Sequence, residues 1–214
     1  MLVYERFVVG MLSNNVYLVW DDSSREAMVV DPAGPCEELE RVVSNKGLEV
    51  VLLVLTHGHP DHLGGLGRYV ELYGARVAMS SEDLAVAASG LGELKDLLLG
   101  EELDGIELDL DLSCEDQVRI GDETLSVIRT PGHTPGSVCL YCDSCSPPLL
   151  FSGDTLFFRS VGRTDLPGGD YRALLRSLSL LEGLPGHTLV LPGHGPSTTI
   201  AQERAHNPFW PRRR

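Results

Sequence analysis

The sequence predicts an α/β (α+β) fold in which two mixed β-sheets pack face to face and helices cover the outer side of each sheet, a four-layer αββα sandwich. Two observations support this prediction. Short apolar or alternating segments typical of strands recur along the chain, and in each half a series of strands is followed by helices. Since no linker separates the halves of this 214-residue chain, we expect a single domain over residues 1–214.

The first half opens with three segments that we expect to form an antiparallel meander: residues 3–9, 15–20 and 27–30. Pro35 suits the first turn of a helix, and Gly47 suits its end. Ser80 or Ser81 can cap a later helix whose first turn is acidic. The expected order after the meander is helix 35–46, strand 50–55, helix 63–73, strand 76–79 and helix 83–99.

The second half repeats the theme of strands followed by helices. Five strands are expected first, at residues 107–110, 117–120, 124–130, 137–141 and 149–152. A helix at 171–181, a strand at 188–191 and a final helix at 198–206 complete the expected order.

The amino-acid composition is typical of a globular protein and argues against a membrane-spanning one. Hydrophobic residues make up 43% and charged residues 22% of the chain, as in ordinary globular proteins, and no apolar stretch is long enough to cross a bilayer. The N-terminus is typical of a strand rather than a signal peptide, so we expect a cytoplasmic protein. The net charge of -14 repels phosphate backbones and argues against nucleic acid as a partner. We expect a small-molecule substrate, no membrane partner, and a monomer or homodimer.

The segment T-H-G-H-P-D-H (residues 56–62) directly follows the apolar strand at 50–55. It holds three of the seven histidines of the chain, which argues against a merely solvated loop. Imidazoles and carboxylates are ligands for zinc and iron, and catalytic sites leave one coordination position for water. The candidate ligands in this segment are His57, His59, Asp61 and His62.

Three further strands end in a potential ligand beside a glycine. These residues are His133 in P-G-H-T-P-G, Asp154 in S-G-D and His194 in P-G-H-G-P. Each alone is weak evidence, because a histidine at such a place is often a turn residue, but four such segments in order are strong evidence. Together they offer more ligands than one tetrahedral ion with an open position can use, which favours two ions about 3.5–4 Å apart.

The order H-x-H-x-D-H, His, Asp, His resembles the metallo-β-lactamase-fold hydrolases, and within them the glyoxalase II-like (hydroxyacylglutathione hydrolase-type) group. The segments F-S-G-D-T-L-F (151–157), G-R-T-D-L-P-G-G-D (162–170) and P-G-H-G-P (192–196), with the later N-P-F (207–209), also fit that group. The resemblance covers about residues 14–209. Relatives that hydrolyse glutathione thioesters carry an extra C-terminal helical domain, whereas only 20 residues follow His194 here, so we expect that domain to be absent.

The resemblance implies a division of the ligands between two divalent metal ions. His57, His59 and His133 would hold the first ion. Asp61, His62 and His194 would hold the second, and Asp154 would bridge both. Zinc is the expected metal, with iron and manganese as alternatives.

The implied activity is hydrolysis of a thioester of the hydroxyacyl-glutathione type by a metal-bridging hydroxide. Asp61, which would orient that hydroxide or accept its proton, and the bridging Asp154 are the expected catalytic residues.

Two other activities remain open. A persulfide dioxygenase of the same fold would hold a single iron through His57, His133 and Asp154, and the sequence does not exclude it. A non-catalytic scaffold is disfavoured because all seven ligand positions are filled. β-Lactamase and nuclease activities are also disfavoured, the first by the ligand pattern and the second by the lack of a basic surface.

Roles outside the ligand set are less sharply defined. Arg163 could clamp a substrate carboxylate or pair internally with Asp165 or Asp170. Asp31 could support a ligand imidazole or simply form a turn before a proline. We expect His187 and His206 to be surface or structural residues.

The cysteines at 139, 142 and 145 form C-x2-C-x2-C. This spacing allows a metal cluster, a disulfide or free thiols. We favour free thiols because the segment reads as a β-hairpin. Cys36 and Cys114 are isolated in the sequence.

Overall fold

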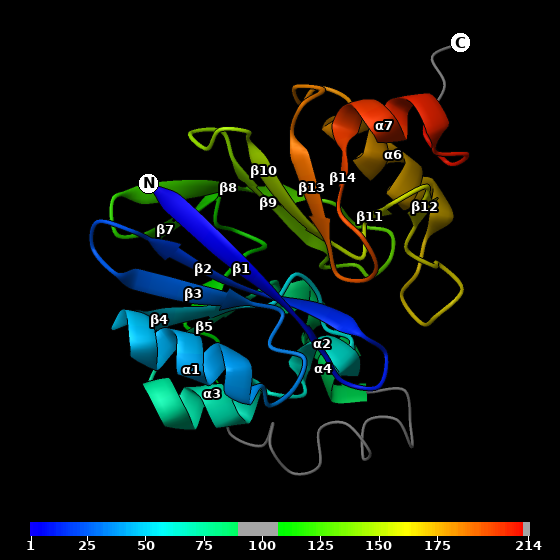
Figure 1. Cartoon of the computed structure of the whole chain (residues 1–214). Helices are drawn as coiled ribbons and strands as arrows, with labels where there is room; N and C mark the ends of the chain where they lie inside the picture. Colours follow the sequence, from blue (N-terminus) through cyan, green and yellow to red (C-terminus); the bar gives the residue numbers. More distant parts are fainter. Residues whose placement is uncertain (90–106, 212–214) are drawn as a thin grey trace.

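The structure, a computed structural model, describes residues 1–89 and 107–211. Within these residues the strands form two six-stranded sheets and a two-stranded ribbon (Figure 1). The first sheet has the order β1-β2-β3-β4-β5-β6. Its strands are β1 (Leu2–Val9), β2 (Asn14–Asp21), β3 (Glu26–Val30), β4 (Glu49–Val54), β5 (Arg76–Met79) and β6 (Leu110–Asp111). The first three strands are antiparallel and β3 to β6 are parallel, so the sheet is mixed.

The second sheet has the order β14-β13-β10-β9-β8-β7. Its strands are β7 (Gln117–Ile120), β8 (Glu123–Arg129), β9 (Val138–Cys142), β10 (Leu149–Gly153), β13 (Leu189–Pro192) and β14 (Thr198–Thr199). Only β10 and β13 pair in parallel, so this sheet is also mixed. The ribbon joins β11 (Leu156–Phe157) to β12 (Ser160–Val161).

Helices cover the outer face of each sheet, as Figure 1 shows. The first sheet is covered by α1 (Glu37–Lys46) and α3 (Leu66–Tyr73), whose buried side chains share one core cluster with that sheet. The second is covered by α6 (Tyr171–Leu181) and α7 (Ile200–His206), which form a second cluster with β9, β10 and β13. A third cluster fills the space between the sheets, where the rings of Tyr17 and Phe151 meet edge to face at 5.3 Å. The predicted four-layer αββα sandwich is therefore confirmed.

Local sequence explains where the covering helices begin and end. Helix α1 has acidic residues in its first turn and ends at Gly47, which has a φ of 60°. Helix α6 begins at Asp170, whose carboxylate accepts hydrogen bonds from the backbone N–H groups of Arg172 and Ala173. Its apolar stripe, spaced at three and four residues, lies on the second sheet through Leu174, Leu178 and Leu181.

The structure departs from the prediction at the segment after the histidine-rich loop. The predicted helix at 63–73 is divided into α2 (Pro60–Leu63) and α3, because Pro60 already starts a helical turn inside the loop. The break lies at Gly65, whose backbone packs so closely on Gly34 that an added Cβ would lie 2.8 Å from the Gly34 carbonyl carbon. The break therefore lets this segment pack against the loop after β3.

Other departures concern short elements. The predicted helix at 83–99 is a 3-10 turn (Ser81–Asp83) followed by α4 (Leu84–Ser89), and its remaining residues lie outside the described part of the chain. The strand predicted at 107–110 is reduced to β6. The two-residue strands β11, β12 and β14 were not predicted, because two residues are too few to show an alternating pattern.

The ligand-bearing loops all leave the same rim of the sandwich. Strands β8, β10 and β13 run in one direction, and each ends immediately before or within the segment that carries His133, Asp154 or His194. Strand β4 of the other sheet ends before His57. Within the described residues, no helix has both the length and the apolar character that crossing a membrane requires.

Candidate metal centre

Seven side chains from the two sheets converge at this rim. Their ligand atoms fall into three sets whose members lie within 4.8 Å of one another: His57, His59 and His133; His57, His62 and Asp154; Asp61, His62 and His194. The first and third sets coincide with the two triads that the resemblance implied. Every predicted ligand therefore belongs to a cluster that could hold an ion, although three of them come from segments distant in sequence.

In the first triad, Nδ1 of His59 lies 2.8 Å from Nε2 of His133. The ring of His57 meets both neighbouring rings at centroid distances of 4.9 and 4.8 Å. In the second triad, Nε2 of His194 lies 3.3 Å and Nε2 of His62 lies 3.7 Å from Oδ2 of Asp61. These ligand atoms point toward common centres.

Asp154 lies between the two triads. Its Oδ2 is 3.5 Å from Nε2 of His133, and its Oδ1 is 3.5 Å from Nε2 of His62. Nε2 of His194 lies 3.7 Å from Oδ2. One carboxylate thus faces imidazoles of both triads, as a bridging ligand must.

Buried polar atoms without partners test whether this cluster suits a metal. Within the described part of the chain, Nε2 of His57, Nε2 of His62 and Oδ1 of Asp154 are buried and accept or donate no hydrogen bond. Leaving such atoms unsatisfied is costly, and native structures rarely do so. Their position and their donor chemistry fit divalent cations bound by imidazole and carboxylate.

Backbone carbonyls orient two of the imidazoles. Nδ1 of His133 donates to the carbonyl of Arg163 at 2.7 Å, and Nδ1 of His194 donates to the carbonyl of Leu12 at 3.1 Å. In each ring the other nitrogen, Nε2, is the one that faces the cluster. Fixing the proton on Nδ1 directs the Nε2 lone pair into the cluster, where a metal ion could replace its present neighbours, His59 and Asn14.

Asp31 orients part of the histidine-rich loop. Its carboxylate accepts hydrogen bonds from the Thr56 backbone N–H at 2.7 Å and the Thr56 hydroxyl at 2.8 Å. Because that hydroxyl donates its proton to Asp31, it accepts a hydrogen bond from Nδ1 of His57 at 3.1 Å. The other ring nitrogen, Nε2 of His57, can then bind a metal. Oδ2 of Asp31 also lies 3.0 Å from Nδ1 of His62, outside hydrogen-bonding direction. Of the two roles considered for Asp31, the structure shows the supporting one, at a strained φ of 52°.

Asp83 is a supporting residue that the sequence did not reveal. It is fully buried, and its carboxylate accepts hydrogen bonds from the Gly58 N–H at 2.8 Å, the Thr134 hydroxyl at 2.6 Å and the Gly136 N–H at 2.6 Å. Gly58 lies between His57 and His59, and the other two partners follow His133 by one and three residues. Asp83 therefore ties the two loops of the first triad together.

Asn14 is a second residue that the sequence did not reveal. Its amide donates to Oδ2 of Asp61 at 2.9 Å and lies 3.3 Å from Nε2 of His194. The next residue, Asn15, donates to the carbonyls of Pro192 and Gly195 and so holds the His194 loop against β2. The adjacent asparagines at the start of β2 were the available signal.

Close packing explains the glycine before His194. A Cβ on Gly193 would collide with Oδ1 of Asp154 and would lie 2.7 Å from Cε1 of His62. Only glycine lets the backbone pass this close to two candidate ligands.

Burial and neighbouring charges give the candidate histidine ligands different protonation states. Burial lowers the pKa of His57 well below its usual value, and burial together with His133 lowers the pKa of His59 to about 4. Burial also acts to lower the pKa of His62, but the carboxylates of Asp154, Asp31 and Asp61 outweigh it and raise the pKa to about 10. His57 and His59 are therefore neutral at pH 7, whereas His62 keeps a proton that a metal would have to displace.

The pKa of Asp61 is held below its usual range. Burial acts to raise it, but the imidazole of His194 at 3.3 Å, the charge of His62 and the hydrogen bond from Asn14 outweigh burial. Asp61 is thus a carboxylate at neutral pH, ready to act as a ligand or to accept a proton.

The remaining predicted residues lie outside the cluster. The guanidinium of Arg163 is exposed and forms two hydrogen bonds, of 2.8 and 2.6 Å, with Asp165, so the structure shows the internal pairing rather than a free clamp. His187 and His206 are exposed. All five cysteines are free thiols.

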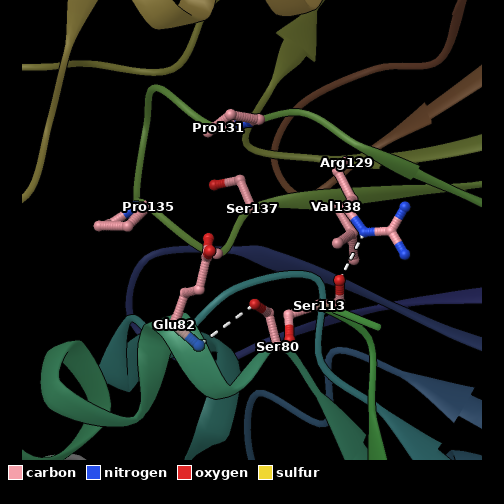
Figure 2. A pocket seen from close by; sticks show the side chains of 9 residues that line it. Ser80, Glu82, Ser113, Arg129, Pro131, Pro135, Ser137 and Val138 are labelled. Carbon is pink, nitrogen blue, oxygen red and sulfur yellow. Dashed lines mark hydrogen bonds between the residues drawn. The ribbon is translucent and has the colours of Figure 1, made fainter. Parts of the chain in front are cut away.

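A pocket lies next to the His133 loop without containing any of the seven candidate ligands. Figure 2 shows its lining, which includes Ser80, Glu82, Arg129 and Ser137. Within it the Glu82 N–H donates to the Ser80 hydroxyl, and Arg129 donates to the Ser113 carbonyl. The chemistry of the site is therefore concentrated at the histidine cluster and not in this pocket.

Comparison with known families agrees with this geometry. The family model of the metallo-beta-lactamase superfamily matches residues 9–194, a span that includes all seven candidate ligands. The chain belongs to the metallo-beta-lactamase superfamily. The predicted family is therefore confirmed.

Several members of this superfamily resemble the chain over nearly its whole length. A protein of Aquifex aeolicus with no assigned function is 40% identical over 202 residues, covering 94% of this chain and 93% of its own. YqgX of Bacillus subtilis, named a probable metallo-hydrolase, is 35% identical and covers 96% of both chains. The hydroxyacylglutathione hydrolase GloC of Haemophilus influenzae is 32% identical and covers 94% of both.

Solved structures of superfamily members share the fold. The di-iron-bound form of TTHA1623 has a TM-score of 0.82 and 34% identity, covering 96% of this chain and 99% of that one. The B3 metallo-beta-lactamase BLEG-1 has a TM-score of 0.80 and 36% identity, with coverages of 97% and 99%. ETHE1 from Myxococcus xanthus has a TM-score of 0.75 and 29% identity, with coverages of 96% and 83%.

Proposed function

We propose that this metal-dependent hydrolase cleaves thioesters of the hydroxyacyl-glutathione type. One observation carries the proposal. Two triads of imidazole and carboxylate ligands, drawn from both sheets, face each other across Asp154, and three of the buried ligand atoms have no other partner within the described residues. The similarity to GloC supports a thioester as the substrate.

Two divalent ions fit these ligands. His57, His59 and His133 would hold one ion, Asp61, His62 and His194 the other, and Asp154 both. We propose zinc, with iron and manganese as alternatives, and the di-iron form of TTHA1623 supports iron as a serious competitor. When bound, such a pair lowers the pKa of coordinated water toward about 7 and polarises a carbonyl group.

The protein side chains would orient the water molecule and accept its proton. Asp61 is an ionised carboxylate held in place by the Asn14 amide, so it can orient a water molecule or accept its proton. Asp154 is fixed between the two triads and would keep their separation constant. His194 and Asp61 are the more exposed of the candidate ligands, so the substrate carbonyl would approach beside them.

A persulfide dioxygenase is the second candidate, supported by the similarity to ETHE1. In that case a single iron would be held by His57, His133 and Asp154. We also propose a small-molecule substrate, a monomer or homodimer, and a cytoplasmic location, with neither nucleic acid nor membrane as a partner.

Metal analysis combined with a thioester assay tests the proposal. Purified protein is expected to contain two metal ions per chain and to release free thiol from S-lactoylglutathione. One iron per chain, with oxygen uptake on glutathione persulfide and no thiol release, would establish the dioxygenase instead. A β-lactam should be included as a further substrate because of BLEG-1, and we expect the thioester to be preferred.

The His194→Ala variant tests the second triad. We expect metal content to fall from two ions toward one and hydrolysis to fall at least about 100-fold, since even residues that only support ligands cost 10–100-fold when changed. His187→Ala, an exposed histidine outside the cluster, is the matched control and should change neither value. Unchanged metal content in His194→Ala would refute the assignment of the second ion.

A further inference from the structure

The cysteines of the C-x2-C-x2-C segment do not all face the same way. Cys139 and Cys142 both lie on β9, and side chains three residues apart on a strand point to opposite faces of the sheet. Cys139 belongs to the cluster beneath α6 and α7, whereas Cys142 belongs to the cluster between the two sheets. Cys139 is therefore separated from Cys142 by the sheet itself and cannot pair with it.

The turn between β9 and β10 brings Cys145 to the face of Cys142. Strand β9 ends at Cys142, the chain bends through residues 143–147, and the half-buried Cys145 packs against the same cluster between the sheets. Ser144 holds this turn in place, because its hydroxyl lies 3.3 Å from Sγ of Cys142 and donates to Oε2 of Glu123 on β8 at 2.9 Å. Cys142 and Cys145 are thus two thiols on one side of an anchored turn.

The two thiols affect each other's ionisation. The neighbouring thiol of Cys145 is the main cause that lowers the pKa of Cys142, and hydrogen bonds from Ser144 and from the Cys145 backbone act in the same direction. Burial and the charge of Glu123 act to raise this pKa but are outweighed. Loss of the first proton belongs to the pair, because the remaining proton lies between the two sulfurs. A thiolate beside a second thiol is an arrangement from which a disulfide forms readily.

Cys142 and Cys145 are both free thiols in the structure. We propose that they form a redox modification site, at which a small-molecule disulfide of the glutathione type oxidises the two thiols to a reversible bridge across the turn. The site lies at the end of the hairpin far from the candidate metal ligands, because β9 begins after the His133 segment and β10 ends at Gly153, next to Asp154. The inference therefore depends neither on the metal centre nor on the proposed hydrolysis.

The oxidation consists of two thiol–disulfide exchanges. Sγ of Cys145, the more exposed of the two sulfurs, forms a bond to one sulfur of oxidised glutathione, whose S–S bond breaks, and one glutathione leaves as a thiolate. Sγ of Cys142 then attacks Sγ of Cys145, and the second glutathione leaves in the same way. The protein loses two electrons and two protons, and the glutathione disulfide gains both and becomes two thiols.

Mass spectrometry of the folded, full-length protein tests the inference. The protein would be equilibrated with equal concentrations of oxidised and reduced glutathione, and its remaining thiols would be alkylated in denaturant. Chymotrypsin, which cuts after Tyr141, then separates Cys139 from the other two cysteines of the segment. We expect more than half of the fragments with Cys142 and Cys145 to lack two hydrogen atoms and to carry no alkyl group, because a second thiol already in place acts at a high effective concentration. Dithiothreitol should restore both thiols.

Three variants assign the roles of the two sulfurs. Cys142→Ser should form no bridge and should keep glutathione on Cys145, because the thiol that would release it is missing. Cys145→Ser should also form no bridge. Cys114→Ser, which removes an exposed cysteine outside the segment, is the matched control and should form the bridge to the same extent as the wild type.

The other outcomes would refute the inference. One is a wild type in which Cys142 and Cys145 are both alkylated at every ratio of oxidised to reduced glutathione. Another is a bridge that involves Cys139 or Cys114, or that joins two chains. Glutathione that stays on Cys145 of the wild type would show that Cys142 cannot reach it, and would equally rule the bridge out.

Discussion

Replacing Asp83 by asparagine should weaken metal binding by the first triad, although Asp83 is not itself a candidate ligand. The buried carboxylate accepts three hydrogen bonds, and these join the loop that carries His57 and His59 to the loop that carries His133. Asparagine keeps the size of the side chain but has one acceptor oxygen in place of two. Its amide NH2 must therefore face either the Gly136 N–H or the pair formed by Gly58 and Thr134, so a donor meets a donor.

The magnitude follows from the bonds that change. In the milder orientation one hydrogen bond to a charged acceptor is lost, which costs about 1.5–3 kcal/mol. The two that remain change from a charged to a neutral acceptor and weaken by about 1 kcal/mol each. We expect the free energy of unfolding to fall by about 4 kcal/mol in total, which corresponds to a Tm lower by about 8–16 °C for a chain of this size.

Urea unfolding and chelator competition measure the two consequences of Asp83→Asn. The chelator experiment should show at least about 10-fold weaker metal binding, because the first triad loses its support. Asp116→Asn, which changes a carboxylate that is 86% exposed, is the control and should alter neither measurement. If Asp83→Asn unfolds at the wild-type urea concentration and keeps its metal, the positioning role assigned to Asp83 is wrong.

Four further predictions concern the candidate ligands and the thiols. Gly193→Ala should lower metal content, because its Cβ would collide with Asp154; a variant that still binds two ions would show that the loop can shift. Metal affinity should rise with pH up to about 10, because the raised pKa of His62 makes the bound proton a competitor. In the metal-free protein, the ion pairs of His62 stabilise the fold fully below about pH 6.5 and progressively less as pH rises through about 10. Calorimetry in two buffers should detect proton release on metal binding at pH 7.5, and no release would contradict this assignment. Burial raises the pKa of Cys139 to about 11, so a thiol reagent should label the exposed Cys114 first and Cys139 only after unfolding, an order that mass spectrometry can check.

The sequence predicted those parts of the fold whose signals are local. Helix α6 has apolar residues at helical spacing, and β4 is a continuous apolar run, so both were predicted nearly to the residue. Each metal-ligand candidate directly follows or closely trails a strand, so its position at a sheet edge could be expected from the chain alone. Which loops combine into each triad was instead implied by the resemblance to the metallo-β-lactamase-fold hydrolases.

The supporting residues could not be predicted in the same way. Asp83 contacts residues 25, 51 and 53 positions away, and Asn14 contacts residues 47 and 180 positions away. In the sequence, Asp83 is an ordinary acidic residue at the start of a helix and Asn14 begins a strand. Their roles depend on packing between distant segments, which neither propensity nor periodicity reports. The break at Gly65 has the same cause, because it depends on the close approach of Gly34.

Each triad draws members from both halves of the sandwich: the loop after β4 supplies two, and β8 or β13 supplies the third. An ion held by either triad would therefore cross-link the two sheets. The free energy of metal binding would then add to the free energy that keeps the two sheets packed together. An ion that binds more tightly would be harder for a chelator to remove and would also raise the stability of the folded protein. Selection for a durable protein and selection for a loaded centre would act on the same contacts.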